Sequence, residues 1–85
     1  KTEEEAVRIS NASSFGLGVT LCTTSEERIG RLVPQFDEGA VFVNELVKSD
    51  PRLPFGGVKR SGYGRELGSF GIREFVNVKT VYLGD

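Results

Sequence analysis

The stretch that decides the fold is FGLGVTLCTTSEERIGRLVPQFDEGAVFVN, residues 15–44. Its first part, residues 15–23, is rich in β-branched and apolar side chains and is bounded by glycines and threonines, which predicts a strand. AVFVN, residues 40–44, is a nearly continuous apolar run, typical of a strand that is buried on both faces. Two strands separated by a helix-length segment predict a βαβ unit with parallel strands. The expected class is therefore α/β.

A helix is expected between these two strands. Residues 24–27, TSEE, form a capping box, and apolar residues follow at helical spacing. Pro34 lies inside this stripe and removes a backbone hydrogen bond, so the helix is expected to bend or tighten there. Gly39 is the expected end of the helix. The stripe consists of Ile29, Leu32, Val33 and Phe36.

The flanking segments predict further elements. A second capping box, TEEE at residues 2–5, predicts a short helix over about 3–12. Residues 45–64 show no periodicity and predict a long loop, which in a compact domain is usually functional or disordered. Apolar residues over 67–76 indicate a short last helix, and KTVYLG at 79–84 indicates a final strand. Nothing local pairs with that strand, so we expect it to pair with another part of a longer protein or with another chain.

Composition excludes several kinds of function. The 85 residues carry a net charge of −1, which argues against a nucleic-acid partner. No apolar run approaches the length of a membrane span and no segment resembles a signal peptide, so we expect no membrane partner and a cytoplasmic location. With no histidine and one cysteine, the chain has no metal site of the zinc type and no Ser–His or Cys–His pair. The chain begins at Lys1 directly before a helix cap, and we therefore expect a piece of a longer polypeptide.

The most unusual stretch is LPFGGVKRSGYGRELG, residues 53–68, which contains five glycines. It does not have P-loop spacing, and its glycines do not match the dinucleotide fingerprint G-x-G-x-x-G, because Gly62 and Gly64 are followed by Gly68 and no strand precedes them. From residue 45 to residue 66 five basic residues face three acidic ones, too small a surplus for nucleic-acid binding. A solvated loop with turn glycines remains an alternative on this pattern alone.

The same stretch resembles the C-terminal signature of the aldehyde dehydrogenase superfamily, P-F-G-G-x-K-x-S-G-x-G-R-E-x-G followed by a helix and K-T-V. Upstream, TEEEAVRISNASSFGLG and TTSEERIGRLVPQFDEGAVFVN are similar to the family's segments in the same order. The resemblance covers all 85 residues. The wording SDPRLPFGGVKRSGYGREL is most similar to the succinate-semialdehyde dehydrogenase branch.

This resemblance implies a protein that oxidises a small aldehyde to a carboxylate with NAD or NADP. In the family a catalytic Cys attacks the aldehyde and a Glu activates water, and both lie upstream of this region. We therefore expect this chain to be inactive alone, to bind no cofactor by itself, and to keep Cys22 as a buried structural thiol. Residues 1–78 are expected to belong to the catalytic domain. Residues 79–85 are expected to be a strand of the oligomerisation region that extends a neighbouring subunit's sheet in a homo-oligomer, a dimer or tetramer.

The resemblance also implies roles for single residues. Phe55 matches an aromatic residue that lines the substrate tunnel, with a packing anchor as the alternative. Glu66 matches a carboxylate near the catalytic Glu and is a candidate for a proton relay; a structural pairing with Arg65 or an upstream Lys is the alternative. Ser49 occupies the position that binds the distal carboxylate of succinate semialdehyde, and Lys48 and Arg52 would add positive potential. Loop architecture and subunit contacts are expected of Asn44, Gly56, Gly57, Lys59, Ser61, Gly62 and Arg65.

A second class of function stays open at this point. The chain could be a free-standing, non-enzymatic dimerisation module that descends from such an enzyme. A continuous reading frame upstream of Lys1, with a Cys nucleophile motif and a cofactor domain, would support the enzyme, whereas an immediate stop codon would support the module.

Overall fold

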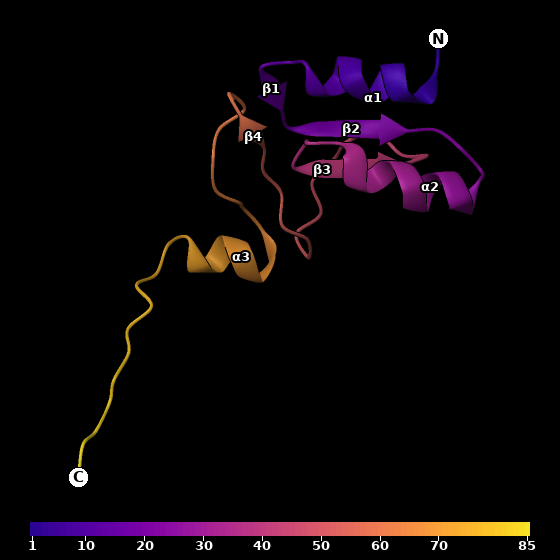
Figure 1. Ribbon diagram of the computed structural model, residues 1–85. Helices are drawn as coiled ribbons and strands as arrows, with labels where there is room; N and C mark the ends of the chain where they lie inside the picture. The colour runs from indigo at the N-terminus through magenta and orange to yellow at the C-terminus, as the bar shows by residue number, and fades with distance from the viewer.

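The computed structural model describes all residues 1–85. Figure 1 shows α1, β2, β3 and α2 lying together, with α3 apart from them and the C-terminal segment leading away from the rest of the chain. The elements in chain order are α1 (Glu3–Asn11), β1 (Phe15–Gly16), β2 (Gly18–Leu21), α2 (Glu26–Leu32), the 3₁₀ helix η1 (Val33–Gln35), β3 (Ala40–Val43), β4 (Val58–Lys59) and α3 (Gly68–Arg73).

The centre of the fold is the pair β2 and β3. The two strands are parallel, and their register runs from Gly18 opposite Ala40 to Leu21 opposite Val43. Helix α2 and η1 connect them, so the parallel pairing agrees with the sequence prediction. The prediction that β3 is buried on both faces was wrong. All four of its residues are only half-buried, because its sheet has two strands.

The connecting helix changes character at the proline. The Ser25 hydroxyl caps α2 by accepting a hydrogen bond from the Arg28 N–H at 3.2 Å. The α-helix ends at Leu32, and the chain continues as the 3₁₀ turn η1 around Pro34. The predicted tightening is confirmed, because proline has no N–H for the i→i−4 bond.

The single strand predicted over 15–23 is wrong. The chain changes partners at Leu17: β1 pairs antiparallel with β4, with Gly16 opposite Val58, whereas β2 pairs with β3. A Cβ on Gly16 would lie 2.6 Å from Val58 Cγ2, so the close pairing of β1 with β4 requires glycine. The segment 45–64, predicted as a loop throughout, therefore contributes a short strand to the fold.

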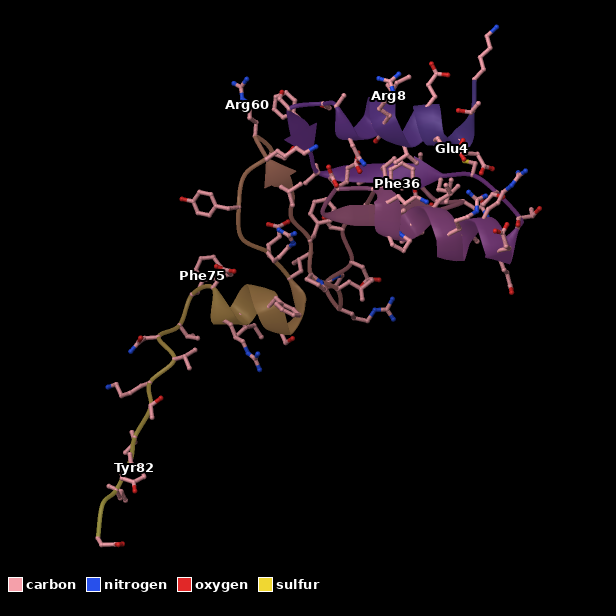
Figure 2. The ribbon with its side chains drawn as sticks, viewed as in Figure 1. Glu4, Arg8, Phe36, Arg60, Phe75 and Tyr82 are labelled. Carbon is pink, nitrogen blue, oxygen red and sulfur yellow. The ribbon has the colours of Figure 1, made fainter.

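The C-terminal segment does not form the predicted strand. Helix α3 ends at Arg73, and no strand is present over residues 79–84. Phe75 lies just beyond α3 and Tyr82 projects from the extended tail (Figure 2). A strand needs a hydrogen-bonding partner, and this chain provides none at that place.

Little apolar surface is buried. Val7 and Leu32 are the buried apolar residues, at 8% and 5% exposure. The accessible surface is 6800 Å², whereas a compact monomer of this size exposes about 5000 Å². The radius of gyration is 16.9 Å, against about 12 Å for a compact domain of this length. The chain therefore presents surface that a compact domain of its length would cover. Its helices are all too short or too polar to cross a bilayer.

Candidate functional site

The glycine-rich loop is closed on itself by Phe55 and Glu66. Each residue donates its backbone N–H to the carbonyl oxygen of the other, at 2.8 Å in both directions. Phe55 is half-buried, while Glu66 is exposed and its carboxylate forms no hydrogen bond or ion pair. No ion pair therefore joins Glu66 to Arg65 or to a lysine of this chain.

The Arg65 side chain holds the inner turn of the loop. Its Nη1 donates to the carbonyl oxygens of Gly57, at 2.8 Å, and Gly64, at 2.9 Å. A Cβ on Gly56 would lie 2.4 Å from the Gly64 carbonyl oxygen, so the two sides of the loop approach closely only because position 56 is glycine. Arg65 is thus committed to main-chain carbonyls.

Ser61 connects the loop to β1. Its hydroxyl accepts a hydrogen bond from the Gly16 N–H at 2.9 Å. A Cβ on Gly57 would lie 2.6 Å from Ser61 Cβ, so the loop folds tightly at this point. Gly62 follows with φ of 109°, a conformation that side chains rarely adopt.

Lys59 connects the loop to α1. Its ammonium donates to the Asn11 carbonyl oxygen at 2.7 Å and lies 3.3 Å from the Asp37 carboxylate. Asn11 is the last residue of α1, where the helix dipole favours a positive charge. The Lys59 side chain therefore connects β4 to the end of α1 and to Asp37. The Lys59 backbone has a φ of 55°.

Asn44 joins the ends of the central strands where the long loop begins. Its Oδ1 accepts from the Thr23 N–H at 2.9 Å and its Nδ2 donates to the Thr23 carbonyl at 2.8 Å. The Asn44 N–H donates to the Leu21 carbonyl at 2.9 Å, and its φ is 56°. Asparagine tolerates this left-handed conformation better than most residues.

Two surface hollows flank Phe55. The first, of about 380 Å³, is lined by the glycine-rich loop, including Glu66 and Arg65, and by residues that follow α3. The second, of about 480 Å³, lies between β3 and the segment that leads to Phe55. Ser49 is exposed and lines neither hollow, although Lys48 and Asp50 on either side of it line the second. The structure thus brings Phe55 and Glu66 together at one hollow, whereas Ser49 lines neither hollow.

The two cations near Ser49 are paired. Lys48 Nζ lies 3.0 Å from a Glu45 carboxylate oxygen, and Arg52 Nη2 donates to Asp50 Oδ2 at 2.7 Å. The hydrogen bond from the Arg52 side chain, with the Arg52 N–H, lowers the pKa of Asp50 far below its usual range. The positive potential expected from Lys48 and Arg52 is therefore balanced by a carboxylate on each.

Asp50 is a residue that the sequence reasoning missed. The signal available was its place before Pro51, because Asp side chains readily accept hydrogen bonds from the backbone two residues on. Asp50 does so here, accepting from the Arg52 N–H at 2.9 Å.

Cys22 was wrongly expected to be buried. It is exposed and lies at a hollow that is lined by residues of α1 and α2, including Val7 and Leu32. That hollow shares no residue with those beside Phe55. No group of three His, Cys, Asp or Glu side chains is placed to hold a metal ion.

The residues present do not fit a nicotinamide dinucleotide. A dinucleotide cradle needs free N–H groups or cations at a glycine-rich turn between a strand and a helix. Here the Arg65 guanidinium donates to the carbonyls of Gly57 and Gly64, and the segment between the loop and α3 passes through Leu67 with φ of 67°. This chain alone therefore provides no built phosphate site.

Comparison with known proteins gives the family. The sequence profile described as "Aldehyde dehydrogenase family" matches residues 1–81. A protein of Synechocystis described as a probable NADP(+) succinate-semialdehyde dehydrogenase is 55% identical over 80 residues, covering 94% of this chain and 18% of that protein. The corresponding enzyme of Mycobacterium ulcerans is 52% identical over 81 residues, covering 95% of this chain and 18% of its own length.

A solved structure agrees with these sequences. The succinic semialdehyde dehydrogenase of Streptococcus pyogenes, crystallised with NADP+, superimposes with a TM-score of 0.93 at 40% identity, covering all of this chain and 19% of its own. The chain belongs to the aldehyde dehydrogenase family. It spans about one fifth of the length of the relatives that it matches.

Proposed function

We propose that this chain is the C-terminal part of an NADP-dependent succinate-semialdehyde dehydrogenase that oxidises succinate semialdehyde to succinate. The observation that carries the proposal is the 55% identity to the Synechocystis enzyme across almost the whole chain. Sequences that share more than half of their residues over a binding segment usually keep its shape. NADP is favoured over NAD because the Synechocystis and Mycobacterium ulcerans relatives are described as NADP(+) enzymes and the Streptococcus pyogenes enzyme was crystallised with NADP+.

In this proposal the chain supplies substrate contacts and no bond-making group. The nucleophilic Cys and the water-activating Glu belong to the remainder of the polypeptide, and the cofactor would supply hydride acceptance there. Phe55 contributes an aromatic wall to the substrate tunnel, supported by its place between two hollows. Ser49 binds the distal carboxylate of the substrate.

Glu66 is proposed to relay a proton near the catalytic Glu. Its carboxylate has no partner within this chain, so it remains available to a group supplied by the rest of the enzyme. A relay carboxylate needs room beside it for the groups that give and take the proton, and Glu66 lines the hollow beside Phe55. Residues 79–85 are proposed to add a strand to a neighbouring subunit's sheet in a homo-oligomer.

The test is kinetic and uses the full-length enzyme. Formation of the reduced cofactor is measured with succinate semialdehyde and with hexanal, as NADPH in the assays with NADP and as NADH in those with NAD. We expect kcat/KM to favour succinate semialdehyde over hexanal by at least about 100-fold, because a site built to bind a polar group rejects an analogue that lacks it. A preference for hexanal would overturn the proposal that succinate semialdehyde is the substrate, and a preference for NAD would overturn the proposal that NADP is the cofactor. A stop codon directly upstream of the first codon would overturn the enzyme.

A further inference from the structure

The turn before Phe55, residues 50–53, is closed by Asp50 and Arg52. Asp50 Oδ1 accepts hydrogen bonds from the Arg52 N–H at 2.9 Å and from Arg52 Nε at 3.0 Å, and Oδ2 accepts from Arg52 Nη2 at 2.7 Å. The Asp50 carbonyl oxygen accepts from the Leu53 N–H at 3.0 Å. Four hydrogen bonds within four residues, three of them to a carboxylate, give this turn one strongly preferred shape.

The two side chains of the pair differ in exposure. The Asp50 side chain is 28% exposed and the Arg52 side chain is 85% exposed. Asp50 lines the hollow of about 480 Å³ beside Phe55, and Arg52 does not. An arginine that bound a substrate carboxylate in this hollow would direct free N–H groups into the hollow. Arg52 instead directs Nε and Nη2 at Asp50, so its contact with the site runs through Asp50.

The turn is also fixed to the start of α3. The Pro51 carbonyl oxygen accepts from the Gly68 N–H at 3.1 Å. A Cβ on Gly68 would lie 3.3 Å from both the Arg52 carbonyl oxygen and the Pro54 nitrogen, so the turn packs directly against this glycine. Gly68 has a φ of 60°, which a side chain rarely adopts. The turn is thus held from within by Asp50 and from outside by α3.

The turn separates the two candidate substrate residues. Ser49 immediately precedes it, and Phe55 follows it after Pro54. Phe55 is itself fixed by the main-chain bonds to Glu66, so the shape of the turn decides where Ser49 lies relative to Phe55. A change in the shape of the turn would therefore shift Ser49, the candidate for the carboxylate end of the substrate, relative to Phe55, the candidate for its aliphatic part.

We propose that Asp50 is a positioning residue for the aldehyde site: its carboxylate, bonded to Arg52, holds the turn at residues 50–53 and thereby sets the distance between Ser49 and Phe55. This inference rests on the proposed aldehyde dehydrogenase function. Arg52 acts as the partner of Asp50 and does not bind the substrate carboxylate.

The test uses the full-length enzyme with Asp50→Asn, Asp50→Ala, Arg52→Gln and the double variant Asp50→Ala/Arg52→Gln. Arg8→Gln is the matched control, because Arg8 is an exposed cation on α1, far along the chain from the turn (Figure 2). Steady-state kinetics are measured with succinate semialdehyde and with butanal, which has the same chain length and no carboxylate.

Positioning predicts a rise in KM at nearly constant kcat. Asp50→Ala is expected to raise KM for succinate semialdehyde about tenfold and to leave KM for butanal nearly unchanged, because the loosened turn displaces Ser49 from the fixed Phe55 and butanal has no carboxylate for Ser49 to bind. Asp50→Asn should have a smaller effect, because its amide oxygen still accepts from the Arg52 N–H. The double variant should be no worse than Asp50→Ala, because both residues act through one contact.

A readout independent of activity accompanies the kinetics. Hydrogen exchange of the peptide covering residues 49–56 should be faster in Asp50→Ala than in the parent and unchanged in Arg8→Gln, with equal melting temperatures. An increase in KM for succinate semialdehyde that is larger in Arg52→Gln than in Asp50→Ala, and that adds to the effect of Asp50→Ala in the double variant, would make Arg52 a direct ligand and overturn the proposal. Unchanged KM and exchange in Asp50→Ala would overturn it too, as would a fall in melting temperature that accounts for both changes. The unmodified enzyme's own activity with succinate semialdehyde tests the proposed function separately.

Discussion

Phe55 and Glu66 lie opposite one another, joined by two main-chain hydrogen bonds of 2.8 Å. The bridge therefore fixes the tunnel candidate and the proton-relay candidate relative to one another without using either side chain. Changing a side chain at these positions should leave the bridge in place, so chemistry can be tested apart from structure.

The first prediction concerns the Glu66 carboxylate. In the full-length enzyme, Glu66→Gln should lower kcat by about tenfold or more, because the amide cannot relay a proton. The melting temperature should stay unchanged, since the exposed carboxylate forms no hydrogen bond or ion pair within this chain. Glu4→Gln, an exposed carboxylate on α1 shown in Figure 2, should leave both quantities unchanged. An unaltered kcat in Glu66→Gln would remove the relay role.

The second prediction compares two glycines. A Cβ on Gly39 would lie 1.8 Å from the Gly56 carbonyl oxygen, so Gly39→Ala must displace the glycine-rich loop and should cost about 1–3 kcal/mol or more. Gly30 lies inside α2, and no atom other than those of its chain neighbours and the helix's own backbone lies within 4 Å of its Cβ position. Gly30→Ala should therefore stabilise the protein, by about 0.5–1 kcal/mol. Denaturant unfolding of the full-length enzyme measures both, and destabilisation by Gly30→Ala would contradict the helix.

The sequence predicted the elements that depend on local patterns. A helix start near residues 24–27 and a change of helix type at Pro34 follow from a few neighbouring residues, and both are present, although the capping residue is Ser25 and not the Thr24 of the predicted capping box. The split of the first strand at Leu17 was not predictable, because Gly16 pairs with Val58 while Gly18 pairs with Ala40. The pairing partner of a strand depends on residues far along the chain, and the alternating pattern of the strand itself does not identify that partner.

The third prediction concerns Asn44, which combines a left-handed backbone with two side-chain hydrogen bonds to Thr23. Asn44→Ala loses the bonds and keeps an unfavourable backbone, so we expect a loss of about 2–4 kcal/mol. Asn44→Gly loses the same bonds but relaxes the backbone, and should cost about 1–2 kcal/mol less than the alanine variant. Equal losses in denaturant unfolding would show that the φ of Asn44 carries no strain.

The fourth prediction is a pH dependence between α1 and α2. Arg31 Nη2 donates to Glu3 at 2.6 Å and Arg28 Nε lies 3.0 Å from it; the hydrogen bond from Arg31 is the main cause that lowers the pKa of Glu3 below 4.5. A lowered folded pKa means that this stabilisation is complete above the ordinary value and is lost as pH falls through the lowered one. Glu3→Gln should therefore melt below the parent at neutral pH, and the difference should shrink as the pH falls below 4.5.

Salt provides the control for this ion pair. The Glu3 side chain is about one third exposed, so added salt should also shrink the difference between parent and Glu3→Gln at neutral pH. Glu4→Gln should melt with the parent under all of these conditions. A difference that grows towards acid pH would show that the pKa of Glu3 is raised and not lowered.

The candidate site shows a similar division. The motif over residues 53–68 located Phe55 and Glu66, and the structure places them side by side. The motif could not show that the Arg65 side chain donates to main-chain carbonyl oxygens or that the Arg52 side chain donates to the Asp50 carboxylate. Both contacts depend on how the turns fold. Charge counts treat Lys48 and Arg52 as free cations, whereas geometry pairs each with a carboxylate.

The last prediction concerns the uncovered surface of the 85-residue chain. Val78, Tyr82 and Leu83 in the extended tail are each at least 80% exposed, and the chain exposes 6800 Å², about 1800 Å² more than a compact monomer of its size. Apolar surface and free main-chain N–H and C=O groups in an extended segment favour pairing with another chain. The isolated chain should therefore self-associate, with a light-scattering mass of at least twice that of one chain.

A proline variant separates strand pairing from apolar contact as the cause. Val81→Pro removes a main-chain donor from the middle of the tail, so it should lower the scattering mass if association uses strand pairing. Gly84→Ala, at a position with nothing within 4 Å, should leave the mass unchanged. A single-chain mass together with a sharp, cooperative unfolding transition would contradict the expectation, since it would show a chain that is stable without cover on its apolar tail.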